Sequence, residues 1–261
     1  MVMYTFRDYI SKFRHYFRFS KEEIEACVIS VLAMAFIISF NEWGYGSQFD
    51  FSIGLGNYIK AVIIMGAVLL IQLVTTKLMA LYWGFRAEYK LWWYGILFGL
   101  GLAFLSGSFT NTLGKATIIW FLASGGIFFH HLAKHRLGWF RYGVNTWETA
   151  LCCMMGSLSS ILLAIFVKII LYVIPGSLFF QKLLSVSLWF ALFTILPIPP
   201  LNGSRLFFAS RVTYFYILGL IVAFNILLRT ILGLFWIILI SILFGGLTWA
   251  WSLWKVEKIA K

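Results

Sequence analysis

The sequence has few charged residues. Only 11% of its 261 residues are charged, whereas 62% are hydrophobic, and its mean hydropathy is +0.91. A soluble domain carries roughly twice this share of charged residues, so the composition excludes a soluble enzyme. Several stretches of about 17 to 25 residues lack any charge, and each is long enough to cross about 30 Å of hydrocarbon. We therefore expect a multi-pass helical protein of the cell membrane.

Cysteine and acidic residues are also scarce. Cys27 stands alone and Cys152 and Cys153 are adjacent, which is not the spacing of a disulfide framework or a zinc knuckle. The 21 Lys and Arg residues outnumber the 9 Asp and Glu residues, which gives a net charge of +12. In a multi-pass protein, basic residues collect in cytoplasmic loops and set the orientation. The positive charge therefore indicates orientation in the bilayer and no nucleic-acid partner.

The N-terminal segment, residues 1–20, is expected to be separate from the membrane domain, residues 21–261. Apolar residues recur every three or four positions over residues 1–19 with basic residues between them, which predicts an amphipathic helix on a membrane surface. A loosely ordered basic tail is the alternative. Ser20, followed three residues later by Glu23, predicts a capping box that begins the first crossing.

The distribution of charge predicts six crossings with both termini in the cytoplasm. The loop at residues 41–57 has acidic residues but no Lys or Arg, so it should face outward. Two shorter apolar stretches, about 91–106 and 117–129, are expected to form a hairpin that enters the bilayer from inside and returns. The predicted crossings are residues 21–40, 58–83, 148–174, 182–208, 212–228 and 231–254.

The four prolines lie in two places, and three of them are close together. Pro197, Pro199 and Pro200 fall within the predicted crossing at residues 182–208. Proline removes a backbone donor, which is tolerated at membrane depth only where the freed groups are buried in protein or face a polar cavity. A broken membrane helix is therefore a candidate site, and a kink compensated by neighbouring helices is the alternative.

The proline-rich segment resembles a known family. Residues 191–205, ALFTILPIPPLNGSR, are similar to the "LFNLLPxPPLDGS" segment of site-2 proteases, the intramembrane zinc metalloproteases, in their archaeal branch. Residues 77–92 resemble the "KLVARRYGFWAEYRAW" run that follows the HExxH helix of this family. Residues 123–129 resemble its strand-like "APGAVYI" segment, and residues 156–160 resemble its "GPLxN" segment, with Ser157 and Ser160 at the Pro and Asn positions.

The resemblance implies a fold and a degenerate site. The fold would be an all-α, six-crossing membrane domain with a partly extended cytoplasmic insertion at about 84–147. The HExxH motif falls on Gln72, Leu73, Val74, Thr75 and Thr76, and Asn202 replaces the zinc-binding Asp. Two histidines, a glutamate base and an aspartate would be needed to hold and use zinc. The glycines and prolines that define the fold in this family are retained at Gly84, Gly156, Pro197, Pro199, Pro200 and Gly203.

These replacements indicate a pseudoprotease that needs no cofactor. It would bind or regulate transmembrane helices of other proteins in the lipid bilayer without zinc-dependent hydrolysis. Gln72 is expected deep in the membrane, where its amide needs partners. We therefore expect Gln72, Thr75 or Thr76, and Asn202 to form an interhelical hydrogen-bond cluster at the position of the zinc.

Two alternatives stay open at this point. An active zinc metalloprotease would need an unorthodox site, for which His131 and His135, four residues apart, are the candidates if they lie on a helix. Neighbouring Lys134, Arg136 and Arg141 instead favour a solvated basic loop. A small transporter or channel would need a polar path across the bilayer, and few polar residues are predicted near mid-depth.

Overall fold

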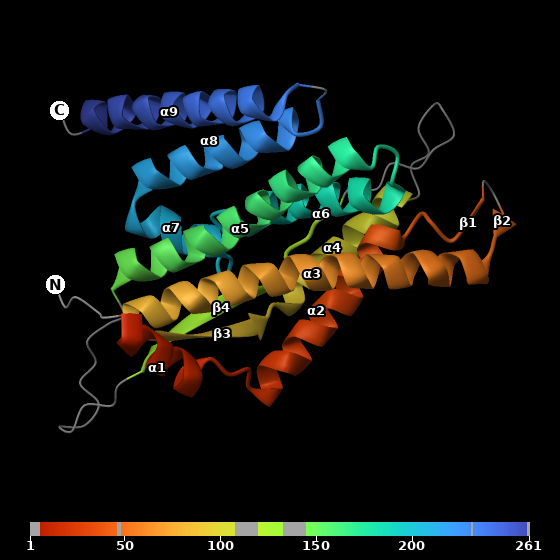
Figure 1. The fold of residues 1–261 in the computed structure, drawn as a ribbon, viewed down its shortest axis with the longest axis horizontal. Coiled ribbons are helices and arrows are strands. Elements are labelled where there is room, and N and C mark those ends of the chain that lie inside the picture. The colour runs from red at the N-terminus through yellow and green to blue at the C-terminus, as the bar shows by residue number, and fades with distance from the viewer. Residues whose placement is uncertain (1–5, 46–47, 108–119, 133–144, 231, 260–261) are drawn as a thin grey trace.

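The computed structural model describes residues 6–45, 48–107, 120–132, 145–230 and 232–259. This part of the chain is mainly helical (Figure 1). In chain order its elements are α1 (Phe6–Tyr16), α2 (Lys21–Ser39), β1 (Gly44–Tyr45), β2 (Gln48–Phe49), α3 (Phe51–Trp83), β3 (Phe85–Leu91), α4 (Trp93–Gly107), β4 (Gly125–His131), α5 (Thr146–Val173), α6 (Leu178–Thr194), α7 (Asn202–Ala209), α8 (Arg211–Leu227) and α9 (Leu234–Ile259).

Three of the described helices, α3, α5 and α9, are long and apolar enough to cross a membrane. α4, α6 and α8 are apolar but shorter. The surface of the molecule carries many large hydrophobic side chains, which suits contact with lipid. The expectation of a helical membrane protein is thus supported, whereas the number of six crossings and the orientation of the termini stay predictions.

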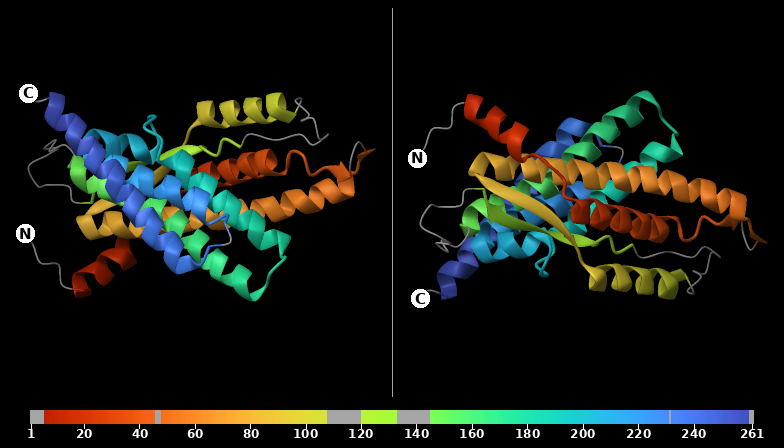
Figure 2. Two further views of the ribbon diagram at one scale, coloured as in Figure 1. Left: turned by 90° about the horizontal axis from the view of Figure 1, so that it is seen from above. Right: turned by 90° about the horizontal axis from the view of Figure 1, so that it is seen from below.

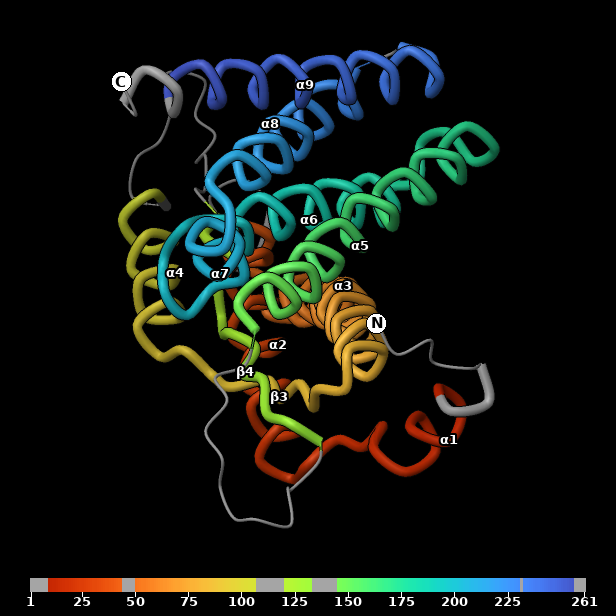
Figure 3. The backbone as a smooth tube through the Cα atoms, turned by 90° about the vertical axis from the view of Figure 1, so that its left-hand side faces the viewer, coloured from red at the N-terminus to blue at the C-terminus, as the bar shows by residue number. Residues whose placement is uncertain are grey.

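The helices are stacked in layers around α3 and α5. α5 packs against α3, α6 and α7, and α8 packs against α9 at the outer side of the stack (Figures 1 and 3). α4 lies to one side of the bundle, where it contacts α2 (Figure 2). The interior is aliphatic: Met34, Ile64, Met65, Leu188 and Ile195 are almost completely buried. This packing fixes the position of α5 relative to the helices on both of its sides.

The expected insertion contains an antiparallel pair of strands. α3 ends at Trp83 and is capped by Gly84, which has a left-handed backbone (φ 81°) that glycine adopts without strain, and β3 begins at the next residue. β3 pairs with β4 from Phe85 opposite His131 to Leu91 opposite Gly125. The prediction of a partly extended segment is therefore correct. Only part of the insertion is described, and its depth in a membrane stays a prediction.

The break that the prolines predict within the segment at residues 182–208 is present, while its role as a membrane crossing stays a prediction. α6 ends at Thr194 and α7 begins at Asn202, and the turn between them contains Pro197, Pro199 and Pro200. Proline has no backbone N–H and its ring clashes with the preceding turn, so the helix cannot continue through this segment. The hydropathy of the segment indicates burial but says nothing of this break, which only the prolines indicate.

The predicted capping box at the start of α2 is half correct. The hydroxyl oxygen of Ser20 accepts a hydrogen bond from Glu23 N, 3.2 Å away. The Glu23 carboxylate does not reach back to Ser20. Its Oε2 lies 2.7 Å from Lys77 Nζ, and its Oε1 accepts from Tyr89 N at 3.1 Å. Glu23 therefore joins the start of α2 to the end of α3 and to β3.

The Lys77 ammonium has further partners in this buried junction. It donates to the carbonyl oxygen of Arg18 at 3.1 Å and lies 4.0 Å from the ring centroid of Phe19. Both side chains of the ion pair are buried, 7% exposed for Lys77 and 2% for Glu23. Nearby, the Tyr89 hydroxyl shares hydrogen bonds with Ser30 and Ser124, and burial raises the pKa of Tyr89 to about 12.

The N-terminal helix α1 is formed as expected, and several of its apolar side chains are only partly covered by the rest of the protein. Ile10, Phe13 and Tyr16 are each more than a third exposed. The helix is held to the bundle by Tyr9, whose hydroxyl donates to the carbonyl oxygen of Leu78 at 3.2 Å. Placement of α1 on a membrane surface stays a prediction.

Removal of one partner of the buried ion pair is expected to destabilise the fold strongly. Glu23→Gln leaves the Lys77 ammonium buried without its counter-charge, which should lower the free energy of unfolding by about 3–5 kcal/mol. The double variant Glu23→Gln, Lys77→Met buries no charge, so its free energy of unfolding should fall by less than that of Glu23→Gln or Lys77→Met alone. Unfolding in detergent, followed by circular dichroism, measures these differences.

The exposed pair Arg86–Glu88 provides the matched control. Glu88→Gln should change the free energy of unfolding by less than about 1 kcal/mol, because solvent screens this contact. Equal losses in the single and double variants would show that the buried charges are not what the junction depends on.

Candidate functional site

Polar side chains from two helices, α3 and α7, meet at Gly156 of a third, α5. A Cβ atom placed on Gly156 would lie 3.4 Å from Gln72 Cγ and 3.6 Å from Asn202 Nδ2, and it would overlap Thr76 Oγ1. Gln72 and Asn202 are therefore no farther apart than the sum of those two distances. A residue without a side chain is needed here so that α3 and α7 can approach α5. The fold thus brings together the three positions that the sequence resemblance assigns to zinc ligands.

α3 supplies two of these side chains. Gln72 and Thr76 are four residues apart, so they lie on the same face of the helix, and both are buried. Thr76 Oγ1 donates to the carbonyl oxygen of Gln72 at 2.9 Å. Thr75 lies on another face, is only partly buried, and donates to the carbonyl oxygen of Ile71 at 2.8 Å. Of the two threonines considered for the cluster, the structure therefore places only Thr76 within it.

The proline-rich turn positions the third side chain. Asn202 is the first residue of α7, directly after this turn, and is 4% exposed. A Cβ on Gly203 would lie 2.6 Å from the carbonyl oxygen of Leu196, so α7 rests on the end of α6. A Cβ on Gly126 of β4 would lie 2.8 Å from Pro200 Cβ, so β4 supports the other side of the turn. These close contacts hold Asn202 against α5.

The expected hydrogen bonds between Gln72 and Asn202 are not formed. Within the described residues, Gln72 Oε1, Asn202 Nδ2 and Ser160 Oγ are buried and have no hydrogen-bond partner. A buried polar group without a partner costs about 1–3 kcal/mol. Gln72 and Asn202 both lie close to Gly156, but Gln72 Oε1 and Asn202 Nδ2 do not pair with each other. The site therefore presents unused acceptors and donors.

Sequence reasoning did not assign Ser160 to this cluster. Ser160 lies one helical turn after Gly156 and is completely buried. Its neighbour Ser157 is also buried, and Ser157 Oγ lies 3.4 Å from Thr194 Oγ1 at the end of α6. The signal available in the sequence was the four-residue spacing of Gly156 and Ser160, which puts both on one face of α5.

None of the side chains in this cluster is ionisable. Leu73, at the position of the family's glutamate base, is 3% exposed and apolar, so it cannot accept a proton. Glu88 lies in β3, where it contacts Arg86 at 3.1 Å and His130 at 3.7 Å. Glu148 lies in the first turn of α5, about 12 Å along the helix from Gly156. The cluster therefore lacks a carboxylate that could activate water.

The donor set does not fit zinc. Zinc in proteins is held by thiolates, imidazoles and carboxylates, whereas this cluster offers amides and hydroxyls. In the described part of the chain, no group of three or more His, Cys, Asp or Glu side chains could hold a metal ion. The three cysteines are free thiols.

The alternative histidine site is not supported by the local geometry. His131 ends strand β4 and is not on a helix, so the four-residue spacing that would align it with a second imidazole does not apply. Its ring lies 5.2 Å from that of Phe85, its partner in β3. His135 lies outside the described residues.

Comparison with known proteins gives one similarity that bears on function. The chain is 29% identical over 194 residues to "Putative zinc metalloprotease MJ0611" of Methanocaldococcus jannaschii, and the match covers 72% of this chain and 85% of that protein. The similarity supports a metalloprotease-like family. No family model matches the chain, and no solved structure matches it.

Substitution of Gly156 tests the close approach of α3 to α5. In Gly156→Ala the added Cβ overlaps Thr76 Oγ1, and the free energy of unfolding should fall by about 1–3 kcal/mol. The double variant Gly156→Ala, Thr76→Ala removes the overlapping hydroxyl and should recover most of this loss. Gly101→Ala in α4 is the control, since a Cβ there meets no atom within 4 Å. A stable Gly156→Ala single variant would contradict the described packing.

Proposed function

We propose that this protein is a pseudoprotease of the site-2 protease type, which binds transmembrane segments of other proteins and does not hydrolyse them. The observation that carries the proposal is that α3, α5 and α7 bring the positions of the family's zinc ligands together while each position holds a neutral side chain: Gln72, Thr76 and Asn202. The similarity to a protein named as a putative zinc metalloprotease agrees with a fold of the metalloprotease type.

The chemistry of the cluster favours binding over hydrolysis. This cluster has no metal ligand set and no base at Leu73, so none of its own side chains can generate hydroxide at neutral pH. The unpaired Gln72 Oε1 is an acceptor and the unpaired Asn202 Nδ2 is a donor. Both atoms are buried between α3, α5 and α7, so a client segment reaches them only where these helices separate. One backbone amide of a locally unwound client then supplies the complementary donor and acceptor, which lipid does not.

Zinc content tests the loss of the metal site. Elemental mass spectrometry of the detergent-purified protein should find no stoichiometric zinc. The variant Gln72→His, Leu73→Glu, Thr76→His, Asn202→Asp should bind about one zinc per chain. Three of its replacements restore the two His and one Asp ligands at positions that the fold already brings together, and Leu73→Glu restores the base.

A variant with the two histidines on another face of α3 is the matched control. Ile71→His, Thr75→His, Asn202→Asp has similar composition, but Ile71 and Thr75 are more exposed than Gln72 and Thr76 and lie away from Asn202. It should bind no stoichiometric zinc. Stoichiometric zinc in the unaltered protein, or cleavage of a transmembrane peptide that a chelator stops, would overturn the proposal.

Client binding can be measured with designed peptides. A fluorescent transmembrane peptide with a central Gly-Pro break exposes backbone amides, and an unbroken polyleucine peptide does not. In nanodiscs, energy transfer should report tighter binding of the broken peptide. Gln72→Leu or Asn202→Leu should weaken it about tenfold, the effect of one or two intramembrane hydrogen bonds. Thr75→Val, on another face of α3, should have no effect. Equal binding of both peptides to all variants would contradict the assigned role.

A further inference from the structure

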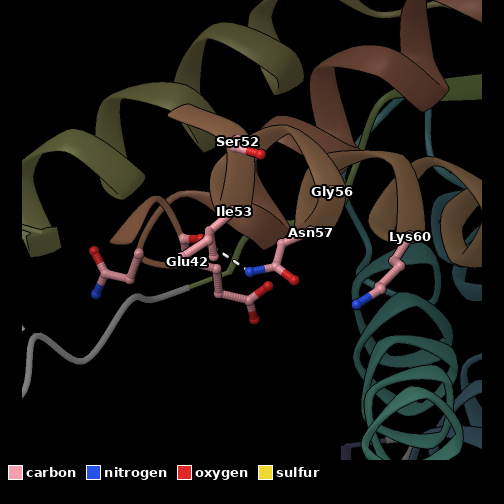
Figure 4. Close-up of a pocket in the computed structure, with 7 residues that line it drawn as sticks. Glu42, Ser52, Ile53, Gly56, Asn57 and Lys60 are labelled. Carbon is pink, nitrogen blue, oxygen red and sulfur yellow. Dashed lines mark hydrogen bonds between the residues drawn. The ribbon is translucent and has the colours of Figure 1, made fainter. Parts of the chain in front are cut away.

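A polar pocket lies at the opposite end of α3 from the ion pair. Its volume is about 470 Å³, within the range of small-molecule sites. It is formed by the turn after α2 and by one face of the first turns of α3 (Figure 4). The lining residues are Asn41, Glu42, Ser52, Ile53, Gly56, Asn57 and Lys60. The pocket is separate from the cluster at Gly156, so its role does not depend on the proposed function.

The length of α3 places this pocket at a membrane boundary. The helix has 33 residues and is about 50 Å long, whereas the hydrocarbon core of a bilayer is about 30 Å thick. The uncharged residues 61–76, bounded by Lys60 and Lys77, make up about 24 Å of the length of α3. The three turns before Lys60 therefore extend beyond the apolar segment, at the depth of lipid head groups.

Aromatic side chains agree with this depth. The Trp43 ring lies 6.1 Å from that of Phe51 and 6.5 Å from that of Tyr58, measured between ring centroids. Trp and Tyr gather where the apolar interior of a membrane meets the head groups. The ring of Trp43 also packs against Gly54, which fixes the turn after α2 on α3.

The charges in the pocket do not cancel. Glu42 Oε2 lies 2.5 Å from Lys182 Nζ of α6, so the carboxylate already has a cation as partner. Asn57 Nδ2 donates to the carbonyl oxygen of Glu42 at 3.0 Å, which leaves the Asn57 carbonyl oxygen as an acceptor. The exposed Lys60 ammonium has no hydrogen bond or ion pair with the described residues. The pocket therefore offers an unpaired positive charge beside hydrogen-bond acceptors.

The side chains of Asn57 and Lys60 project from the side of α3 on which Glu42, in the turn after α2, also lies (Figure 4). Gly56 lies among them, and a Cβ placed on it would meet no atom within 4 Å, so the floor of the pocket is open helix backbone. We propose that the pocket binds a phosphoryl group that carries an amine or a hydroxyl, the chemistry shared by a phospholipid head group and its water-soluble glycerophosphodiester. Lys60 binds the phosphoryl oxygens. Asn57 and Glu42 accept hydrogen bonds from the amine or hydroxyl.

Lipid binding to the delipidated full-length protein tests this site. In native mass spectrometry, phosphatidylethanolamine should remain bound, whereas a diacylglycerol with the same acyl chains, which lacks the phosphoryl group, should not. Lys60→Gln removes the charge and should weaken phosphatidylethanolamine binding about tenfold. A Cβ at Gly56 meets no atom within 4 Å, so Gly56→Leu should extend into the pocket and weaken phosphatidylethanolamine binding similarly, with little loss of thermal stability. Lys255 of α9, which lies over Trp251, provides the control. Lys255→Gln should bind phosphatidylethanolamine as tightly as the unaltered protein does.

A second arm distinguishes the two sources of the ligand. Titration with glycerophosphoethanolamine alone should displace the lipid if the pocket recognises the free phosphodiester, and should leave it bound if the acyl chains are also required. Either result, together with the loss of binding in Lys60→Gln and Gly56→Leu, supports the site. Equal retention of phosphatidylethanolamine and diacylglycerol, or binding that neither substitution changes, would overturn it.

Discussion

The buried ion pair between Glu23 and Lys77 is the constraint on which this end of the molecule depends. Two charges removed from water need partners for their remaining hydrogen-bonding groups, and here Tyr89 N and the Arg18 carbonyl oxygen supply them. The pair therefore ties together the start of α2, the end of α3 and the strand that follows. Because Lys77 directly follows Thr76, this junction also fixes the rotation of α3 that directs Gln72 and Thr76 toward α5.

Much of the helical architecture could be predicted from uncharged runs in the sequence, including the start of α2 at its Ser20 cap, but the start of α3 could not. The apolar pattern indicates a crossing from residue 58, whereas α3 begins at Phe51 because the Asp50 carboxylate accepts hydrogen bonds from Ser52 N and Ile53 N. Hydropathy measures affinity for lipid, and a helix can extend beyond the lipid once it is capped. The same limit applies to α6 and α7, where the apolar run continues through a turn that proline imposes.

Gln72, Thr76 and Asn202 could be predicted as members of the site, whereas Ser160 and the hydrogen bonds of the site could not. The spacing of Gln72 and Thr76 and the resemblance at Asn202 were enough to expect these side chains together. Whether two amides pair depends on the distance between helix backbones, which Gly156 sets and which no local pattern encodes. The sequence also did not predict the long-range ion pairs Glu23–Lys77 and Glu42–Lys182. Each of these side chains has a local interpretation that looks sufficient by itself.

The neutrality of the cluster at Gly156 has a consequence for its environment. Amides and hydroxyls do not titrate over the physiological pH range, so the polarity of the cluster is the same in acidic and alkaline surroundings. A group without net charge also does no electrical work when it moves across a membrane potential, whereas one elementary charge gains about 2.3 kcal/mol per 100 mV. Gln72, Thr76, Ser160 and Asn202 thus form a polar centre that is insensitive to both the proton gradient and the voltage of the membrane around it.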